Sequence, residues 1–375
     1  MNFYNGKIFD VKTLEYKEGG FSIEDGKFAK VSSCIKDGID LEGKKIIPGL
    51  IDVHGHGNSG FDFSMCDLNG LKTMSRYLAS NGITSFAATN MTAPFDMLKN
   101  AYQNALYIHK NREENEARVL GINMEGPFFS YNKRGAQNPE FLAKPDINVF
   151  KELNDSCDNL IKIVCVAPET EGAMDFIKEV SRTCTVSVAH TEADYDLTLK
   201  AFENGANHMT HLFNGMVGIH HRNPGPVLAA HDTKDVYVEL ICDGVHINPA
   251  VIRAVFKLFE GRVIIISDSL ACCGLPDGRY EMCGLAVNLK GLHATLDDGT
   301  LAGSVTNLHQ MMKNAIKFGV DEGQAIKACT INPATQMKAE NEIGSINEGK
   351  AADFIVCDDD LNIEAVYIAG KKINK

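Results

Sequence analysis

The sequence lacks the features by which membrane, secreted and disordered proteins are usually recognised. No stretch reaches the roughly 18 consecutive apolar residues of a membrane-spanning helix. The first residues, MNFYNGKIFDVKTLEYKEGG, lack the apolar segment of a secretion signal. No low-complexity block interrupts the chain. These absences predict a cytoplasmic protein that does not insert into a membrane and that folds along its whole length.

Positively charged residues are also fewer than negatively charged ones. Lys and Arg number 37 against 49 Asp and Glu, and the net charge of -12 is scattered rather than gathered in an acidic tail. Nucleic acids and anionic membranes repel such a chain, so neither is expected as its main partner. A small anionic ligand held by a local arginine remains compatible with this charge.

The cysteines do not suggest a disulfide framework. Their number, 11, is odd, and Cys165, Cys242 and Cys357 lie within apolar, strand-like runs. Together with the missing secretion signal, this pattern predicts reduced thiols packed in the core.

From residue 46 onward, short apolar runs alternate with amphipathic stretches of helical length. This alternation is typical of repeated βα units around a parallel sheet. We therefore expect a TIM-like (β/α)8 barrel over residues 46–343. The strand-like runs are 46–56, 83–90, 118–126, 161–168, 185–190, 208–214, 236–246 and 263–269.

The two ends of the chain have a different pattern. Residues 1–45 and 344–375 contain short strand candidates separated by turn residues, without long helices. Neither end could bury a core alone, and chain termini commonly lie close together. We therefore expect both ends to form one small β-sandwich domain beside the barrel.

Side chains that can bind metal follow the predicted strands at their carboxyl ends. In a barrel of this kind these ends meet on one face, where the chemistry takes place. Imidazole and carboxylate groups are the usual ligands of Zn(II) and Fe(II). The candidates are His54 and His56 after the first run, Glu125 after the third, His190 after the fifth, His211 after the sixth, His246 after the seventh and Asp268 after the eighth.

Two neighbouring segments leave alternatives open. His208 shares a strand with His211, but an offset of three places them on opposite faces of a strand, so only His211 should point inward. Arg222 lies in the turn-rich segment GIHHRNPGP and is suited to bind a phosphate. A surface arginine in a flexible loop explains Arg222 equally well.

With these residues identified, the chain resembles the amidohydrolase superfamily, and within it the N-acetylglucosamine-6-phosphate deacetylase family. The stretches PGLIDVHGHG, NMEGPFFS, VAHTEAD, THLFNGM, RNPG, CDGVH, SDS, LAGS and GSINEGKAADFIVCDDDLN carry the resemblance, in order, along essentially the whole chain. The HxH pair is widespread in the superfamily, whereas EGPF, THLFNGM and DGVH together are narrow to this family. The resemblance implies a (β/α)8 barrel beside a β-sandwich built from both termini.

The resemblance also implies roles for individual residues. Glu125, His190 and His211 would bind one metal ion, zinc or iron, and Asp268 would lie against the metal as catalytic acid and base. His54 and His56 match members that hold a second ion, bridged to the first by Glu125, so one or two ions per subunit are expected. Substrate contacts would come from Ala136, Gln137, Asn214, Gly215, Arg222, Asp243, His246, Leu301, Ala302 and Gly303.

One residue departs from the pattern of the family. Some members have a histidine that polarises the amide carbonyl where this chain has Gln137. A glutamine side chain donates a hydrogen bond but cannot supply a proton or a positive charge. The carbonyl would therefore depend more on the ion at His54 and His56.

The implied activity is metal-dependent hydrolysis of the acetamido group of N-acetylglucosamine 6-phosphate by a homodimer. The sequence does not distinguish this substrate from its galactosamine epimer. A cyclic-amide hydrolase of the dihydroorotase kind is a weaker alternative, because no lysine ends the fourth run and Lys162 lies at its start. A non-catalytic barrel is disfavoured by the carboxylate of Asp268 kept beside a metal site.

Overall fold

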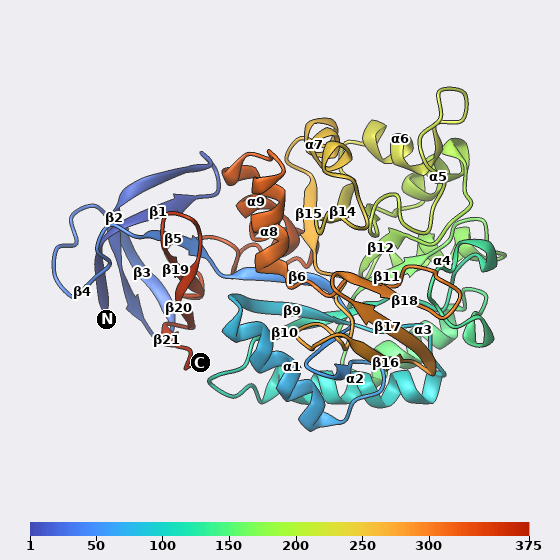
Figure 1. Ribbon diagram of the computed structural model, residues 1–375, viewed down its shortest axis with the longest axis horizontal. Helices are drawn as coiled ribbons and strands as arrows, with labels where there is room; N and C mark the ends of the chain where they lie inside the picture. The colour runs from blue at the N-terminus through green and yellow to red at the C-terminus, as the bar shows by residue number, and fades with distance from the viewer. Residues whose placement is uncertain (375) are drawn as a thin grey trace.

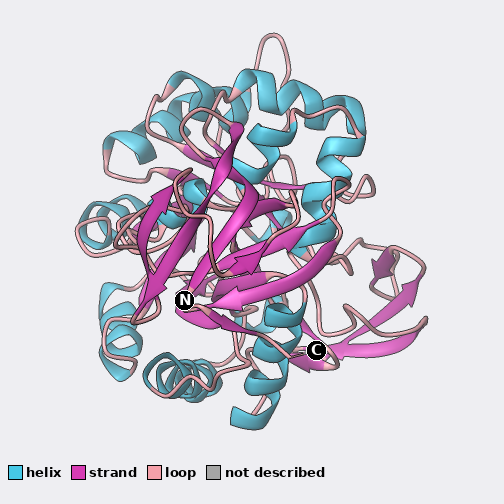
Figure 2. Ribbon diagram, turned by 90° about the vertical axis from the view of Figure 1, so that its left-hand side faces the viewer, coloured by secondary structure: helices cyan, strands magenta, loops and turns pink. Residues whose placement is uncertain are grey.

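The computed structural model describes residues 1–374 and contains a barrel of eight parallel strands (Figures 1 and 2). The strands follow one another around the barrel in chain order, which confirms the expected fold class. The circle is completed where the backbone amide of Asp268 donates to the carbonyl oxygen of His54 at 2.8 Å. The strands are β6 (Leu50–Gly55), β9 (Ile83–Thr89), β10 (Arg118–Met124), β11 (Ile161–Val166), β12 (Thr185–Val188), β13 (His208–Met209), β14 (Tyr237–Ile241) and β15 (Val263–Ile266).

A helix follows each barrel strand and covers its outer side (Figure 2). Side-chain oxygens cap the amino ends of several of these helices, as when Asp67 accepts from the amide of Gly70 and Asp194 from that of Leu197. Gly82 and Gly205 follow α1 and α5 with positive φ, which glycine adopts without strain. The helices are α1 (Leu68–Ser80), α2 (Phe95–Lys110), α3 (Ile147–Ser156), α4 (Ala173–Val180), α5 (Tyr195–Glu203), α6 (Gly225–Asp232), α7 (Pro249–Leu258) and α8 (Leu308–Lys317).

Two more helices, α9 (Glu322–Ala328) and α10 (Ile331–Gln336), close the amino-terminal end of the barrel. The side chain of Asn332 donates to the carbonyl oxygen of Val263, and the amide of Ile51 donates to Cys329. Both contacts involve the start of a barrel strand. The opposite end of the barrel, where the strands terminate, is left for the site.

The two ends of the chain pair in one further sheet of eight strands, seen at the left of Figure 1. Strand β5 pairs with β1 on one side and with β19 on the other, so pairing extends three residues beyond residue 45. The strands are β1 (Asn2–Asp10), β2 (Glu15–Glu24), β3 (Lys27–Ser32), β4 (Ile39–Asp40), β5 (Lys45–Pro48), β19 (Phe354–Cys357), β20 (Ile363–Ile368) and β21 (Lys371–Lys372).

This terminal sheet curls around an aromatic core of its own. Four strand spacings separate β3 from β19, which is about 19 Å in a flat sheet. Nevertheless the rings of Phe28 and Phe354, on these two strands, have centroids 6.0 Å apart. Phe3 and Phe21 pack in the same cluster. The sheet therefore folds over its core and encloses it from both halves.

Smaller elements lie around the carboxyl ends of the barrel strands. The hairpin of β7 (Gly57–Asn58) and β8 (Phe61–Asp62) follows the first barrel strand, and the short helices η1 (Tyr131–Lys133) and η2 (Pro139–Phe141) follow the third. An antiparallel sheet of β16 (Gly278–Met282), β17 (Leu285–Lys290) and β18 (His293–Thr295) follows the last. Within residues 1–374, no helix combines the length and apolar character needed to cross a membrane. All 11 cysteines are free.

Candidate metal centre and active site

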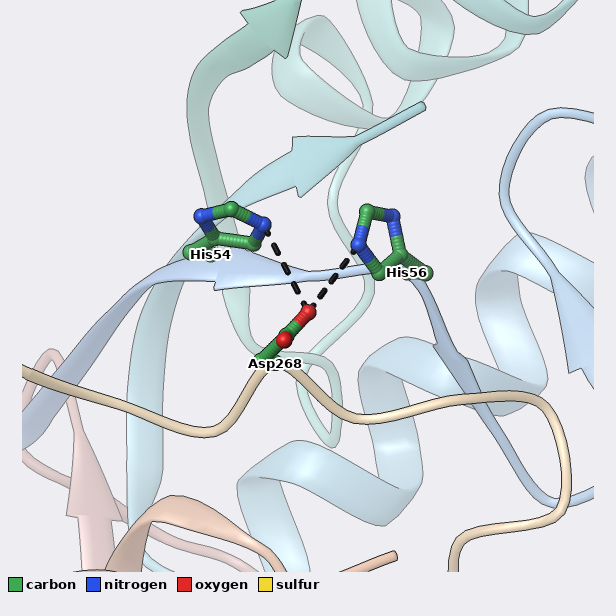
Figure 3. Close-up of side chains that lie close together, drawn as sticks. All are labelled: His54, His56 and Asp268. Atoms are coloured by element: carbon green, nitrogen blue, oxygen red, sulfur yellow. Dashed lines mark ion pairs between the residues drawn. The ribbon is translucent and has the colours of Figure 1, made fainter. Parts of the chain in front are cut away.

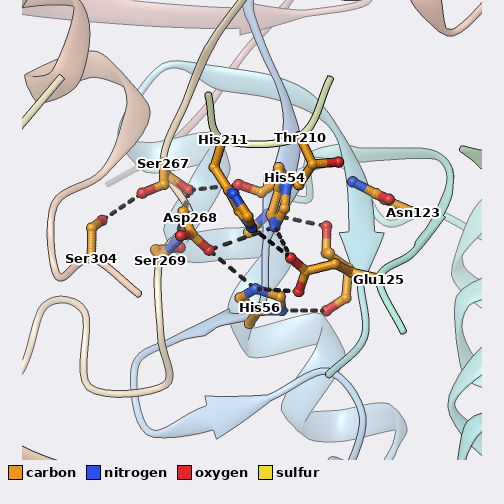
Figure 4. A network of polar contacts seen from close by, with 12 residues as sticks. His54, His56, Asn123, Glu125, Thr210, His211, Ser267, Asp268, Ser269 and Ser304 are labelled. Atoms are coloured by element: carbon orange, nitrogen blue, oxygen red, sulfur yellow. Dashed lines mark hydrogen bonds and ion pairs between the residues drawn. The ribbon is translucent and has the colours of Figure 1, made fainter. Parts of the chain in front are cut away.

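The structure brings six of the seven predicted residues at the strand ends together, while His246 lies apart from them in the wall of the cleft. His54 lies in β6 and His56 just beyond it, while the other four directly follow, or lie two residues beyond, the ends of their strands. None of the six is more than 7% exposed. Figure 4 shows most of these side chains around one centre, which His190 completes. The remaining four are Glu125 after β10, His190 after β12, His211 after β13 and Asp268 after β15.

Three of these side chains form a tight triangle of ligand atoms. Glu125 Oε1 lies 3.2 Å from His190 Nε2 and 3.0 Å from His211 Nε2, and the two nitrogens are 3.1 Å apart. Ligand atoms held about 2.0 Å from one tetrahedral zinc ion lie about 3.3 Å from one another. The triangle therefore has nearly the dimensions of one face of a metal coordination shell.

The HxH pair lies beside this triangle, with both imidazoles directed at Asp268 (Figure 3). His56 Nε2 is 3.1 Å and His54 Nε2 is 3.6 Å from Asp268 Oδ1. The same two nitrogens lie 3.4 and 3.5 Å from the oxygens of Glu125. Two further groups within residues 1–374 have metal-binding spacing, and His54 belongs to both: one adds His56 and Asp268, the other Glu125 and His211.

Hydrogen bonds on the far side of each ring determine which nitrogen faces the centre. The Nδ1 atoms of His56, His190 and His211 lie 3.2, 2.8 and 3.1 Å from backbone carbonyl oxygens, and that of His54 lies 2.8 Å from the carboxylate of Glu239. These oxygens only accept, so Nδ1 of each ring carries a proton, and Nε2 is the atom whose lone pair is available to a metal ion that displaces any second proton. His54 Nε2 is buried and has no hydrogen-bond partner among residues 1–374. Four lone pairs and two carboxylates in one buried place fit a divalent metal ion.

The backbone is strained at three of these residues. His190, His211 and Asp268 have φ angles of 44°, 25° and 47°, in a region that residues other than glycine rarely adopt. Such conformations cluster at functional sites, where the surrounding structure maintains them. Gly303 contributes here, because a Cβ atom on it would meet the carbonyl oxygen of Asp268 at 2.5 Å.

The electrostatics of the centre favour a cation. Burial lowers the pKa of His54, but the charges of Glu239 and Glu125 outweigh it and raise that pKa to about 10. Burial raises the pKa of Glu125, yet the charge of His54 and hydrogen bonds from His190 and His211 hold it well below its usual range. Burial also raises the pKa of Asp268, which the hydrogen bond from His56 and the charge of His54 lower overall. The carboxylates thus stabilise positive charge between them.

A cleft opens directly over this centre, with His56, Glu125, His190, His211 and Asp268 at its base. Eight of the ten residues predicted to contact substrate line it: Ala136, Gln137, Asn214, Gly215, His246, Leu301, Ala302 and Gly303.

The other two predicted contacts lie elsewhere. Asp243 is buried behind the cleft, where its carboxylate is 2.6 Å from His246 Nδ1 and accepts from the amide of Val245. Arg222 is exposed on a loop, with its guanidinium 2.8 Å from His221, outside the cleft lining of this chain. Asp243 therefore positions His246, whereas Arg222 of the same chain is not brought to the centre.

Gln137 is fixed in one orientation. Its Oε1 accepts from the backbone amide of Thr92 at 2.7 Å, so its amide nitrogen faces Glu125 Oε2 at 2.6 Å. One N–H of the side chain is thus used on Glu125. The other N–H of Gln137 remains available to a ligand in the cleft.

The expected orientation of His208 is wrong. Strand β13 covers only His208 and Met209, and the chain leaves the extended conformation before His211, so the alternation of faces does not reach His211. The ring of His208 points into the barrel interior, where Nε2 lies 3.0 Å from the carboxylate of Glu239. Glu239 was not among the predicted site residues, although a single charged residue within the apolar strand YVELI could have indicated it.

Comparisons with known proteins agree with this geometry. The N-acetylglucosamine-6-phosphate deacetylase of Bacillus subtilis (strain 168) is 36% identical over 360 residues, covering 92% of this chain and 90% of the relative. The N-acetylgalactosamine-6-phosphate deacetylase of Escherichia coli O157:H7 is 30% identical, covering 93% of both. A mutant N-acetyl-D-glucosamine-6-phosphate deacetylase from Mycobacterium smegmatis, solved with N-acetyl-D-glucosamine-6-phosphate, superimposes with a TM-score of 0.94 at 27% identity over 100% of this chain and 99% of the other. The model of the amidohydrolase family matches residues 46–373, and this chain belongs to that family.

Proposed function

We propose that this protein hydrolyses the acetamido group of N-acetylglucosamine 6-phosphate to give acetate and glucosamine 6-phosphate. The observation that carries the proposal is the buried set of four imidazoles, each with Nε2 directed at Glu125 or Asp268, of which His56, His190 and His211 line the base of an open cleft. The names and coverage of the relatives support the substrate class.

Glu125, His190 and His211 would hold one divalent ion, zinc or iron, because their three ligand atoms already lie 3.0 to 3.2 Å apart. His54, His56 and Asp268 would hold a second, and the Glu125 oxygens lie 3.5 and 3.4 Å from the Nε2 atoms of His54 and His56. When bound, such an ion supplies a water of lowered pKa and polarises a carbonyl oxygen.

Asp268 is the proton carrier of the proposed reaction. Its pKa is depressed and it lines the cleft, so it is ionised at neutral pH and available to the reacting atoms. Its carboxylate accepts a proton as water adds to the acetamido carbon, and then gives that proton to the nitrogen as the C–N bond breaks. An unprotonated amine is a poor leaving group, so the second transfer is required.

The rest of the cleft orients the sugar phosphate. The free N–H of Gln137 would donate to the acetamido oxygen or a sugar hydroxyl. The hydrogen bond and charge of Asp243 outweigh burial and raise the pKa of His246, which favours the protonated ring that would attract the phosphate. Arg222 would reach the phosphate from a second copy of the chain, since its own loop lies outside the cleft lining. A homodimer is therefore part of the proposal.

The galactosamine epimer is a second candidate, favoured by the similarity to the E. coli enzyme over 93% of both chains. The cyclic-amide alternative receives no support, because Lys162 lies at the start of β11 with Nζ on the carbonyl oxygen of Asn159, at the surface.

Metal content and activity together test the proposal. Protein saturated with zinc or iron should contain two ions per chain and release acetate from N-acetylglucosamine 6-phosphate. The double variant His54→Asn, His56→Asn should fall toward one ion and lose most of its activity. A content of one ion, unchanged in the double variant, would exclude the HxH pair as a metal site. Assay of both epimers identifies the preferred substrate.

A further inference from the structure

A carboxylate outside the predicted set lies beneath the metal centre. Glu239 is fully buried in β14, in the interior of the barrel. Its Oε2 is 2.8 Å from His54 Nδ1 and accepts from the backbone amide of His211 at 3.2 Å, while its Oε1 lies 3.0 Å from His208 Nε2. Within residues 1–374 the cleft lining does not include Glu239. Any role in the site must therefore act through its neighbours.

The partner of His54 differs in kind from those of the other three imidazoles. Thr89, Lys133 and Asn214 offer neutral backbone carbonyl oxygens to His56, His190 and His211. Only His54, among these four, places Nδ1 on a carboxylate. A carboxylate on the far nitrogen fixes the tautomer, holds the ring plane and makes the near nitrogen a stronger electron donor.

The position of Glu239 is itself fixed by contacts on the side of the barrel that α10 closes. His208 Nδ1 lies 3.1 Å from the side-chain oxygen of Gln336, which belongs to the helix α10 that closes the barrel. The chain from Gln336 through His208 to Glu239 is buried along its length. Its upper end is His54, the one side chain shared by both groups with metal-binding spacing.

From these contacts we propose that Glu239 is a positioning residue that makes His54 a metal ligand. It holds the proton of His54 on Nδ1 and places a negative charge behind the ring, so that the Nε2 lone pair faces Glu125 and Asp268. The proposal rests on the proposed metal-dependent function and assigns to that site a residue which does not touch the substrate.

The variant Glu239→Gln separates charge from geometry. With its amide oxygen in the place of Oε2, glutamine still accepts from His54 Nδ1 and the amide of His211. Its amide nitrogen donates to His208 Nε2 when the His208 ring carries its proton on Nδ1, which faces Gln336 Oε1. The variant Glu239→Ala removes the support altogether. Glu116→Gln is the matched control, because Glu116 is also a fully buried carboxylate, bonded to Arg76 and the amide of Glu113 instead of the site.

The experiment measures the affinity of the full-length protein for Co(II) by competition with a chelator, together with the visible spectrum of the Co(II) protein. We expect the weaker-bound ion to lose affinity about 10-fold in Glu239→Gln and about 100-fold in Glu239→Ala, with an altered Co(II) spectrum. Glu116→Gln should be less heat-stable but keep the affinity of the unmodified protein.

Unchanged Co(II) affinity and spectrum in Glu239→Gln, with only a loss of heat stability as in the control, would overturn the inference. Glu239→Gln decides the matter if Glu239→Ala does not fold. If Glu239→Gln loses Co(II) affinity as expected but the unmodified protein releases no acetate, the proposed function is contradicted and the role of Glu239 is supported. Unmodified protein that binds no Co(II) would overturn both.

Discussion

Replacing Asp268 by asparagine removes the proposed proton carrier with the least disturbance of the site. Asparagine has nearly the size of aspartate, and the backbone contacts of residue 268, to the carbonyl oxygen of His54 and the amide of Ser304, do not involve the side chain. The amide oxygen of asparagine can take the place of Asp268 Oδ1, which lies 3.1 Å from His56 Nε2, and it still offers a lone pair to a metal ion. We therefore expect the fold and the metal content to persist.

The expected loss concerns turnover. Transfer of a proton by a positioned side chain contributes about 100- to 10,000-fold to such reactions, and the asparagine can neither accept the proton of water nor return one to the amine. We expect kcat for Asp268→Asn to fall by at least about 100-fold, or roughly 2.7 kcal/mol of transition-state stabilisation. KM should change little, because the acid is required only once the reaction begins.

Acetate release from N-acetylglucosamine 6-phosphate at saturating substrate is the appropriate assay, with metal analysis and thermal unfolding of the same preparation as controls. A kcat within a few-fold of the unmodified protein, at equal metal content, would remove Asp268 from the chemical step. A loss of metal in step with the loss of activity would instead show that its main contribution is to binding the ion.

Three further changes have definite expected outcomes. Gly303→Ala should lower kcat at least about 10-fold with the fold intact, because the new Cβ would lie 2.5 Å from the carbonyl oxygen of Asp268. Gly218→Ala is the control: a Cβ on Gly218 meets no atom within 4 Å, so this variant should behave like the unmodified protein. Arg222→Ala should raise KM for the phosphorylated sugar and leave unphosphorylated N-acetylglucosamine unaffected; equal losses on both substrates would contradict phosphate binding. Burial lowers the pKa of His309, whose Nε2 lies 2.8 Å from the carbonyl oxygen of Leu361. The contribution of neutral His309 to stability is therefore complete above its unfolded pKa of about 6.5, and it is lost as pH falls toward the lower folded pKa. Thermal unfolding at pH 7.5 and 5.5 should show a smaller drop for His309→Gln, and an equal drop would exclude this histidine as a source of the pH dependence.

The sequence predicted the barrel because its strands are buried on both faces. Every residue of β9, ITSFAAT, is buried, and such runs are recognisable without knowledge of their partners. The sheet β16 to β18 was missed for the opposite reason, since Gly278 to Glu281 are largely exposed and carry no apolar pattern. Buried strands could therefore be predicted from the sequence, whereas the exposed strands at the surface were not predicted.

The site was predictable as far as it depends on where strands end. His54, Glu125 and Asp268 follow apolar runs, and the topology of the barrel alone brings such positions together. The depth and direction of individual side chains were not predictable in the same way. His208 and His211 can both face the interior because β13 ends at Met209, so the alternation of a strand does not relate them. Asp268 depends on a strained φ that no sequence period reveals.

The central claim is that a bound divalent ion, held by the imidazoles at the strand ends, is required for removal of the acetyl group. The most direct test is acetate release from N-acetylglucosamine 6-phosphate before chelation, after removal of metal by a chelator, and after addition of zinc or iron(II). The account predicts activity that disappears with the metal and returns when it is restored. Undiminished acetate release by protein shown to be free of metal would contradict it.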